Sequence, residues 1–180
     1  SGDAIDSVTG QPISVTNKNR DKVVTGPDGK QYVMPSDDAA KQVRAISMLT
    51  NSIDADLNTL AEIGKKYSGN ISNWASMSKE DRLLMENARY RVAAAAAKLK
   101  NPSAEPSDDV IKQNLANVPD VTSLSFGDPE QWIKNYKDAV HQDTTSTFNA
   151  YSGASTNLPL PAGFVKDQKQ EKTSYNTSAD

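Results

Sequence analysis

The sequence predicts an all-α fold: an elongated helical bundle built on one long helical hairpin, with a small N-terminal β-hairpin and a disordered C-terminal tail. Two long stretches, 37–67 and 79–100, carry apolar residues at steps of three and four, which place those residues on one side of a helix. A serine precedes each stretch and acidic residues lie in its first turn, as is typical of helix N-termini. Only 36% of the 180 residues are hydrophobic, which indicates a modest core.

Composition divides the chain into three segments: an extended N-terminal segment over 1–34, a helical bundle over 35–153 and a flexible tail over 154–180. The N-terminal segment contains a short hairpin, in which Val24 and Tyr32 pair across a glycine-containing turn. The residues before that hairpin show no sustained periodicity, so we expect them to be extended or disordered. The tail is rich in Pro, Gly, Ser and Thr without an apolar stripe, which predicts a linker or a segment that contacts a partner.

The first long helix is expected over 37–67. Ser36 is a suitable N-cap, and Asp37 and Asp38 fall in the first turn, where the helix dipole favours negative charge. At 1.5 Å per residue this helix is roughly 45 Å long, so it needs partner helices along much of its length. The residues expected to pack on its apolar side include Val43, Ile46, Ile53, Leu57 and Leu60.

The second helix is expected over 79–100. Ser78 followed by Asp81 resembles a capping box with Asp in place of Glu. Leu84 and Val92 belong to its expected apolar side, and the run of alanines near its end has high helix propensity and lets another helix approach closely. The short connection between the two long helices makes them antiparallel neighbours.

Two further helices are expected, a short one over 108–117 and a longer one over 128–151. The longer helix opens on an Asp-Pro-Glu sequence, which supplies an N-cap, a proline at the first helical position and an acid in the first turn. Trp132 and Tyr136 lie on its apolar side. The threonines of its second half lower helix propensity, so we expect this half to fray or bend.

Composition argues against several kinds of site. The chain has no cysteine and one histidine, His141, which excludes thiol nucleophiles, Cys-zinc sites and His-rich metal sites. The paired aspartates at helix starts are explained by capping. The net charge of −3 gives no bulk attraction to nucleic acid or anionic membrane, and no apolar run is long enough to span a bilayer. We therefore expect no catalytic, cofactor-binding or metal-binding residue.

Two groups of residues are candidate contacts for partners. The second helix has a basic face, which usually means a solvated face but also suits weak contact with DNA phosphates. The basic residues considered for this contact are Arg82, Arg89 and Lys98. The tail offers apolar side chains that suit docking onto a partner protein, and these are Leu158, Leu160 and Phe164.

Several sequence segments resemble the helical part of large virion proteins of tailed bacteriophages, in particular the internal or DNA-ejection proteins. The segments are RYRVAAAAAKL, PSDDVIKQNLANVPD and FGDPEQWIKNYKDAV, preceded nearer the N-terminus by VTGPDGKQYVMP. The resemblance implies a non-enzymatic virion component that forms homo-oligomers, contacts other virion proteins and acts in DNA packaging or ejection. It supplies no catalytic residue.

Two alternatives remain open at this point. The first is a helical adaptor or scaffold that binds a partner protein through its tail. The second is an enzyme that acts on peptidoglycan or nucleic acid, for which a pair of carboxylates is the minimum requirement. Spacing selects no pair among the candidates, which are Glu62, Glu80, Glu86 and Glu130.

Overall fold

The computed structural model describes residues 4–16, 18–67, 74–120 and 128–153. These residues are mostly helical, with four helices and a small four-stranded N-terminal sheet. The elements in chain order are β1 (Ala4–Asp6), β2 (Pro12–Ile13), the 3-10 helix η1 (Arg20–Lys22), β3 (Val23–Thr25), β4 (Gln31–Val33), α1 (Asp37–Tyr67), α3 (Lys79–Lys100), α4 (Asp108–Leu115) and α5 (Pro129–Ser152). The tail expected over 154–180 lies outside the described residues.

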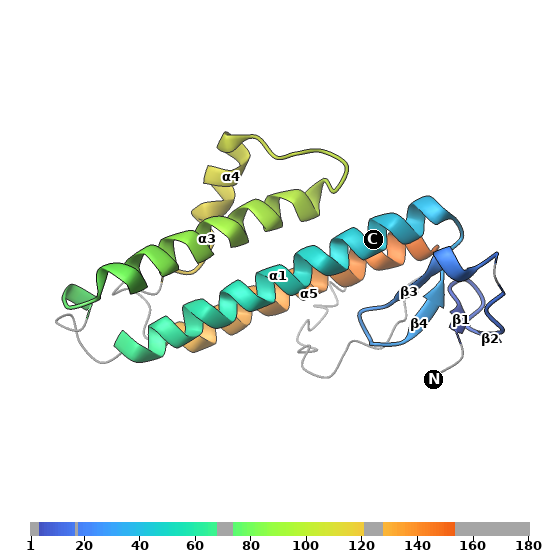
Figure 1. Cartoon of the computed structure of the whole chain (residues 1–180), viewed down its shortest axis with the longest axis horizontal. Helices are drawn as coiled ribbons and strands as arrows, with labels where there is room; N and C mark the ends of the chain where they lie inside the picture. Colours follow the sequence, from blue (N-terminus) through green and yellow to red (C-terminus); the bar gives the residue numbers. More distant parts are fainter. Residues whose placement is uncertain (1–3, 17, 68–73, 121–127, 154–180) are drawn as a thin grey trace, which may run out of the picture.

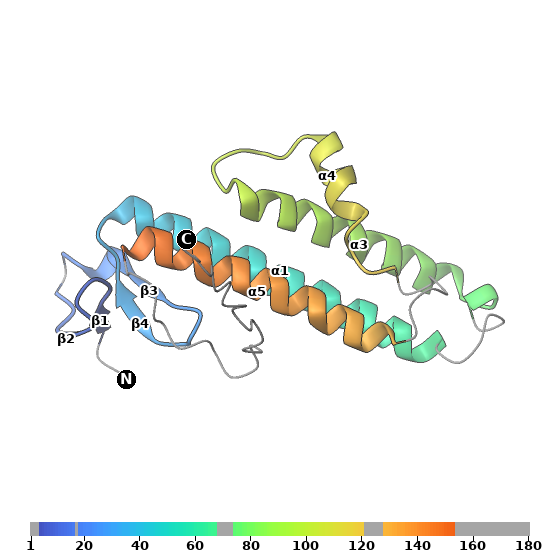
Figure 2. The ribbon, with the colours of Figure 1, turned by 180° about the vertical axis from the view of Figure 1, so that it is seen from behind.

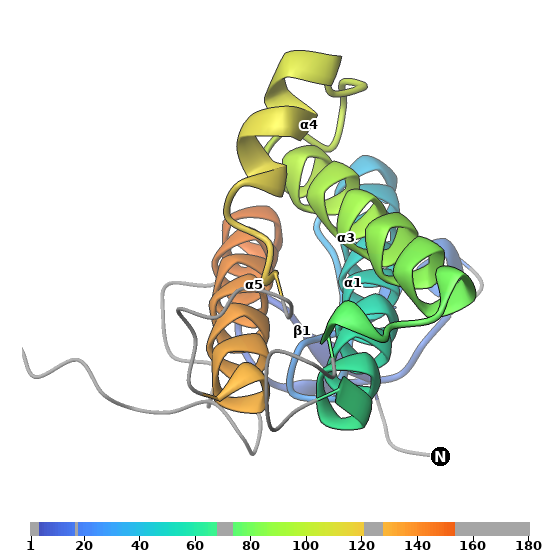
Figure 3. The same cartoon turned by 90° about the vertical axis from the view of Figure 1, so that its left-hand side faces the viewer.

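The helix α1 is the axis of the molecule. It spans 31 residues, and its bounds are those expected from the sequence. Figure 1 shows α3 returning along α1 in the opposite direction, and Figure 2 shows α5 lying antiparallel to α1 over most of its length. The view along the long axis places α3 and α5 against different sides of α1 (Figure 3). The expected antiparallel pairing of the two long helices is confirmed.

The other helices begin where their caps predict. The Ser78 hydroxyl accepts a hydrogen bond from the backbone N–H of Asp81 at the start of α3, and the Asp128 carboxylate caps α5 in the same way. The helix α4 ends at Leu115, two residues earlier than expected, and packs on α3.

The expected fraying of α5 is wrong, because this helix continues to Ser152. The hydroxyls of Thr144 and Thr145 donate to backbone carbonyls four residues earlier. Thr144 is buried, and its oxygen lies 2.6 Å from that of Thr50 on α1. Packing against α1 therefore outweighs the low helix propensity of threonine.

The N-terminal sheet is larger than the expected hairpin. Val24 lies opposite Tyr32 in the antiparallel β3–β4 pair, as expected. The strand order, however, is β2-β1-β4-β3, and β1 pairs in parallel with β4. The expectation of an all-α fold with only a two-stranded hairpin, preceded by an extended or disordered start, is thus wrong in this part. A parallel pair joins segments far apart in sequence, and strands of two and three residues are too short for periodicity to reveal them.

Two clusters of buried side chains form the core. The larger cluster is formed by α1, α3 and α5 with α4 beside them. The smaller cluster joins the sheet to the first turns of α1 and the end of α5. Its centre is an edge-to-face contact between Tyr32 and Phe148, whose ring centroids are 5.2 Å apart. Because α1 and α5 supply residues to both clusters, the sheet is attached to the helical rod by apolar packing.

Candidate functional site

Most of the side chains expected to pack between helices are buried within the chain. Trp132 and Tyr136 of α5 are partly buried, and Tyr136 packs against the larger cluster. The pKa of the Tyr136 hydroxyl is raised to about 12, chiefly by burial. The expected packing residues that are buried are Val43, Ile46, Ile53, Leu57, Leu60 and Val92.

Leu84 departs from this pattern, because it is 44% exposed. Its neighbour Met85 is buried instead, and the buried stripe continues through Ala88 and Val92 at steps of three and four. The expectation that Leu84 packs inside the bundle is therefore wrong for the single chain. The error is a shift of one residue, which moves a side chain by about 100° around a helix.

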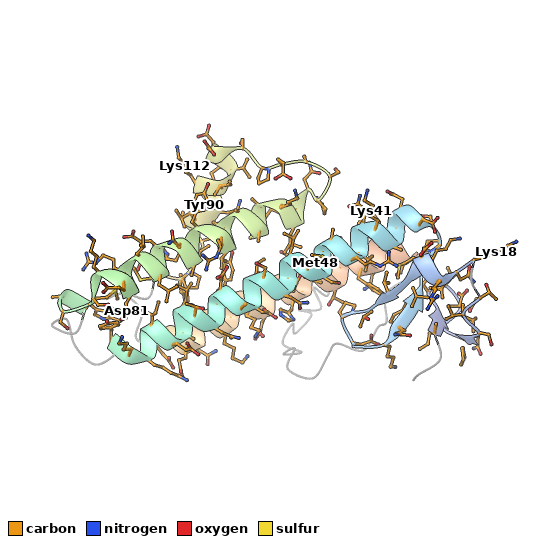
Figure 4. All side chains as sticks on the ribbon, in the orientation of Figure 1. Lys18, Lys41, Met48, Asp81, Tyr90 and Lys112 are labelled. Atoms are coloured by element: carbon orange, nitrogen blue, oxygen red, sulfur yellow. The ribbon has the colours of Figure 1, made fainter. Side chains whose placement is uncertain are left out.

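The outer face of α3 carries two exposed apolar side chains, Leu83 and Tyr90, which we call the α3 outer patch. Leu83 is 57% exposed and Tyr90 is 49% exposed. Figure 4 shows Tyr90 on the side of α3 that faces away from α1. Exposed apolar side chains that gather on one face of a helix are typical of contact surfaces.

The basic residues of α3 are largely engaged by carboxylates of the same chain. Arg89 pairs with Asp120 at 3.5 Å, and the Lys98 amine contacts the carboxylate of Glu105. Arg82 is exposed. Two of the three residues considered for DNA contact therefore already have an anionic partner.

A polar contact between α1 and α5 was missed by the sequence analysis. The His141 Nε2 atom lies 2.7 Å from a carboxylate oxygen of Asp54, and the Lys137 amine lies 3.9 Å from the other oxygen. Only the register between the two helices brings Asp54 and His141 together, and the pattern within either helix carries no signal for that register.

A second polar cluster lies where α1 ends and α3 begins. The carboxylate of Asp81 accepts hydrogen bonds from the Tyr67 hydroxyl and from the Lys66 amine, the latter at 2.5 Å. Hydrogen bonds from Lys66 and then Tyr67 hold the pKa of the Asp81 carboxyl below its ordinary value. Figure 4 shows Asp81 at this junction, so the cluster joins the end of α1 to the start of α3.

A surface groove runs between β3 and α1, which we call the β3 groove. Its volume is about 410 Å³. On one side of the groove the Arg44 guanidinium donates a hydrogen bond of 2.9 Å to the Val23 carbonyl. Met48 on α1 (Figure 4) is 74% exposed beside it. The lining residues are Val23, Val24, Thr25, Gln31, Arg44, Ser47, Met48 and Asn51.

The part of the chain that the structure describes comprises residues 4–16, 18–67, 74–120 and 128–153. Within that part, no three or more His, Cys, Asp or Glu side chains gather where they could hold a metal ion. None of the described helices combines the length and the apolar character that crossing a bilayer requires. The tail residues considered for partner contact, Leu158, Leu160 and Phe164, lie outside the described residues.

The described surface thus offers two features for binding, the α3 outer patch and the β3 groove. Neither brings together the groups that acid–base or nucleophilic chemistry requires. Comparison of the chain with models of protein families, with curated proteins and with solved structures found no match.

Proposed function

We propose that the chain is a non-enzymatic structural component of a tailed-phage virion, which assembles through helix packing and acts in DNA packaging or ejection. The observation that carries the assembly part is the α3 outer patch, where Leu83 and Tyr90 are exposed on a helix whose opposite face is buried. The virion part rests on the resemblance of the helical segments to phage internal and ejection proteins.

A second copy of the chain is the partner that this surface suits. Leu83 and Tyr90 lie seven residues, about two turns, apart on α3, so their side chains share one face of the helix. If two copies pack α3 against α3 in antiparallel fashion about a two-fold axis, Leu83 of each copy meets Tyr90 of the other. Apolar side chains then pack across the contact, as they do at the centre of protein interfaces generally.

The rest of the molecule supports a mechanical role for this contact. The rod formed by α1 and α5 is roughly 45 Å long. It is held by a buried threonine pair, by the Asp54–His141 contact and by an ion pair of 2.6 Å between Lys65 and Glu130. A rod that contacts its copies through α3 can set their relative positions in an assembly. This role needs no reactive site.

The mass of the full chain in solution tests the assembly. We expect light scattering to give a multiple of the monomer mass of 19.4 kDa, and we expect Leu83→Asp to reduce it to the monomer value. Because Leu83 is exposed, the substitution should leave the circular dichroism spectrum of the chain unchanged. The matched control is Val8→Asp, which places the same charge at a residue that is 67% exposed in the N-terminal segment.

Two results would contradict the assembly. One is a wild-type chain that stays at 19.4 kDa at micromolar concentration. The other is an equal loss of mass in both variants. The virion part is tested separately, by mass spectrometry of purified particles of the phage that encodes the sequence. Peptides of this chain are expected at a fixed copy number per particle, and their absence from intact particles would refute a virion component.

A further inference from the structure

The strand β3 has a free edge. It is the last strand in the order β2-β1-β4-β3. Lys22 and Gly26 each hydrogen-bond across the hairpin through their backbones, so Val24 is the hydrogen-bonded residue between them. Because such pairs alternate along an antiparallel ladder, the backbone groups of Val23 and Thr25 point away from β4. An edge of this kind accepts a further strand.

The free edge of β3 opens into the β3 groove. The Arg44 guanidinium occupies one lone pair of the Val23 carbonyl. Among the described residues, no hydrogen bond is made to the outward N–H and C=O of Thr25. Met48 forms an exposed apolar rim on the α1 side. The groove therefore offers backbone hydrogen bonds on one wall and apolar surface on the other.

The end of α5 delivers the C-terminal segment close to this groove. Glu130 pairs with Lys65 and Thr144 with Thr50, so Gly153 lies beside the second turn of α1. From there the middle of the groove is about 8 Å along α1 and one helix width of about 10 Å across it. Five further residues span up to about 17 Å, which brings residue 158 within reach.

The direction of approach also fits. Arg44 of α1 contacts the start of β3, whereas Thr25 at its end lies beside Ser47 and Asn51, further along α1. The strand β3 therefore runs in the same direction as this part of α1. A segment that leaves Gly153 and returns along α1 runs parallel to β3.

The sequence of the segment suits an edge strand. Residues 157–161 read Asn-Leu-Pro-Leu-Pro. A residue that precedes proline favours extended backbone, which applies to Leu158 and Leu160. In an extended strand the two leucines direct their N–H and C=O groups to one side, while Pro159 and Pro161 occupy the other side. Proline has no N–H, so that outer side cannot accept another strand.

We propose that residues 157–161 of the same chain add to β3 as a parallel fifth strand and fill the β3 groove. Parallel pairing places Leu158 opposite Val24. The Leu158 N–H then donates to the second lone pair of the Val23 carbonyl, and the Thr25 N–H donates to the Leu158 carbonyl. Both leucine side chains fall on the face of the sheet toward α1, beside Met48. This docking goes beyond the proposed assembly through α3 and does not depend on it.

Engineered cysteines test the docking in the full chain, since the native sequence has no cysteine. The pair Met48→Cys with Leu158→Cys should form a disulfide within one chain. The matched control keeps Leu158→Cys and pairs it with Val8→Cys, at a residue that is 67% exposed on the side of the sheet away from β3. We expect the first pair to oxidise at least about tenfold faster, because docking raises the local concentration of the two thiols.

Two outcomes of the cysteine experiment overturn the proposal. Equal oxidation rates for both pairs mean that the segment has no preference for the groove. Disulfide-linked dimers in place of internal disulfides mean that the groove takes the segment of a second copy. Gel mobility without reductant distinguishes an internal disulfide from both.

Hydrogen exchange at a single amide gives a second test. The Thr25 N–H, which has no acceptor among the described residues, should be protected in the full chain. Leu160→Pro removes an N–H that the added strand donates to the Thr25 carbonyl, so exchange at Thr25 should rise about tenfold. Leu160→Val keeps that N–H and should change the rate by less than about twofold. A wild-type Thr25 amide that exchanges as fast as in an unfolded peptide refutes the added strand.

Discussion

Asp56 is a buried carboxylate on α1 that depends on a single arginine. It is 8% exposed. The Arg91 Nε atom donates to both of its oxygens at 3.1 and 3.0 Å, and Nη2 adds a third bond. The same hydrogen bonds raise the pKa of the Arg91 guanidinium. Because Arg91 itself is about half exposed, the pair lies at the edge of the α1–α3 contact.

Arg91→Met should lower the free energy of unfolding by about 2 kcal/mol, because it leaves the Asp56 carboxylate buried without its partner. Adding Asp56→Asn to this variant should recover part of the loss, since the unpaired charge is then gone. Urea unfolding followed by circular dichroism measures both effects. Arg82→Met is the control on the exposed face of α3 and should change stability by less than about 0.5 kcal/mol. Equal losses for Arg91→Met and Arg82→Met would contradict the role of the ion pair.

Asp81 makes the closed end of the helical hairpin sensitive to acid. Its pKa is lowered from the ordinary value of 3.8 by hydrogen bonds from Lys66 and Tyr67. A lowered pKa in the folded state stabilises the protein above the unfolded value and loses that effect as the pH falls through the folded value. The urea midpoint of the wild type should therefore exceed that of Asp81→Asn at pH 7, and the difference should shrink below about pH 4. A difference that stays constant down to pH 2 would contradict this assignment.

At the scale of the elements, α1 is the helix that packs against both α3 and α5. Leu57 has no exposed surface and belongs to the larger cluster, which α1 shares with α3 and α5. Leu57→Asp buries an unpaired charge and should cost about 4 kcal/mol or more, enough to unfold a domain of ordinary stability. Asn58→Asp places the same carboxylate on the neighbouring exposed residue and should leave the thermal melt within a few degrees of the wild type. An unchanged melt for Leu57→Asp would mean that this side of α1 is not the core.

Features that a local pattern encodes were predictable. The bounds of α1 and α3 follow from caps at Ser36 and Ser78 and from long apolar periodicity, and both were correct. The features that were missed depend on the register between segments. The parallel pairing of β1 with β4 and the contact of His141 with Asp54 are set by tertiary packing. For Leu84 and Met85 the sequence offers two apolar neighbours at one turn, and only the position of α1 decides which of them is buried.

At the scale of the molecule, the question is whether the sheet and the helical rod unfold together. The smaller cluster contains Val24, Val43 and Phe148, whereas the larger cluster extends to the far end of α1. The two clusters share α1 and α5, and neither helix has a break between them. A helix that is continuous through two cores couples their unfolding, because the loss of one core removes packing that the shared turns need.

The two tryptophans make this coupling measurable. Trp74 packs against the larger cluster, and Trp132 lies in the first turn of α5, so both report on the end of the molecule away from the sheet. Val24→Ala removes buried methyl groups from the smaller cluster and should cost about 2 kcal/mol. If the molecule unfolds as one unit, tryptophan fluorescence and circular dichroism should show the same lowered urea midpoint. Val15→Ala, at a valine that is 44% exposed, should leave both midpoints in place. A fluorescence midpoint that Val24→Ala does not move would show two separate units, and the sheet would then be an appendage of a rod that folds without it.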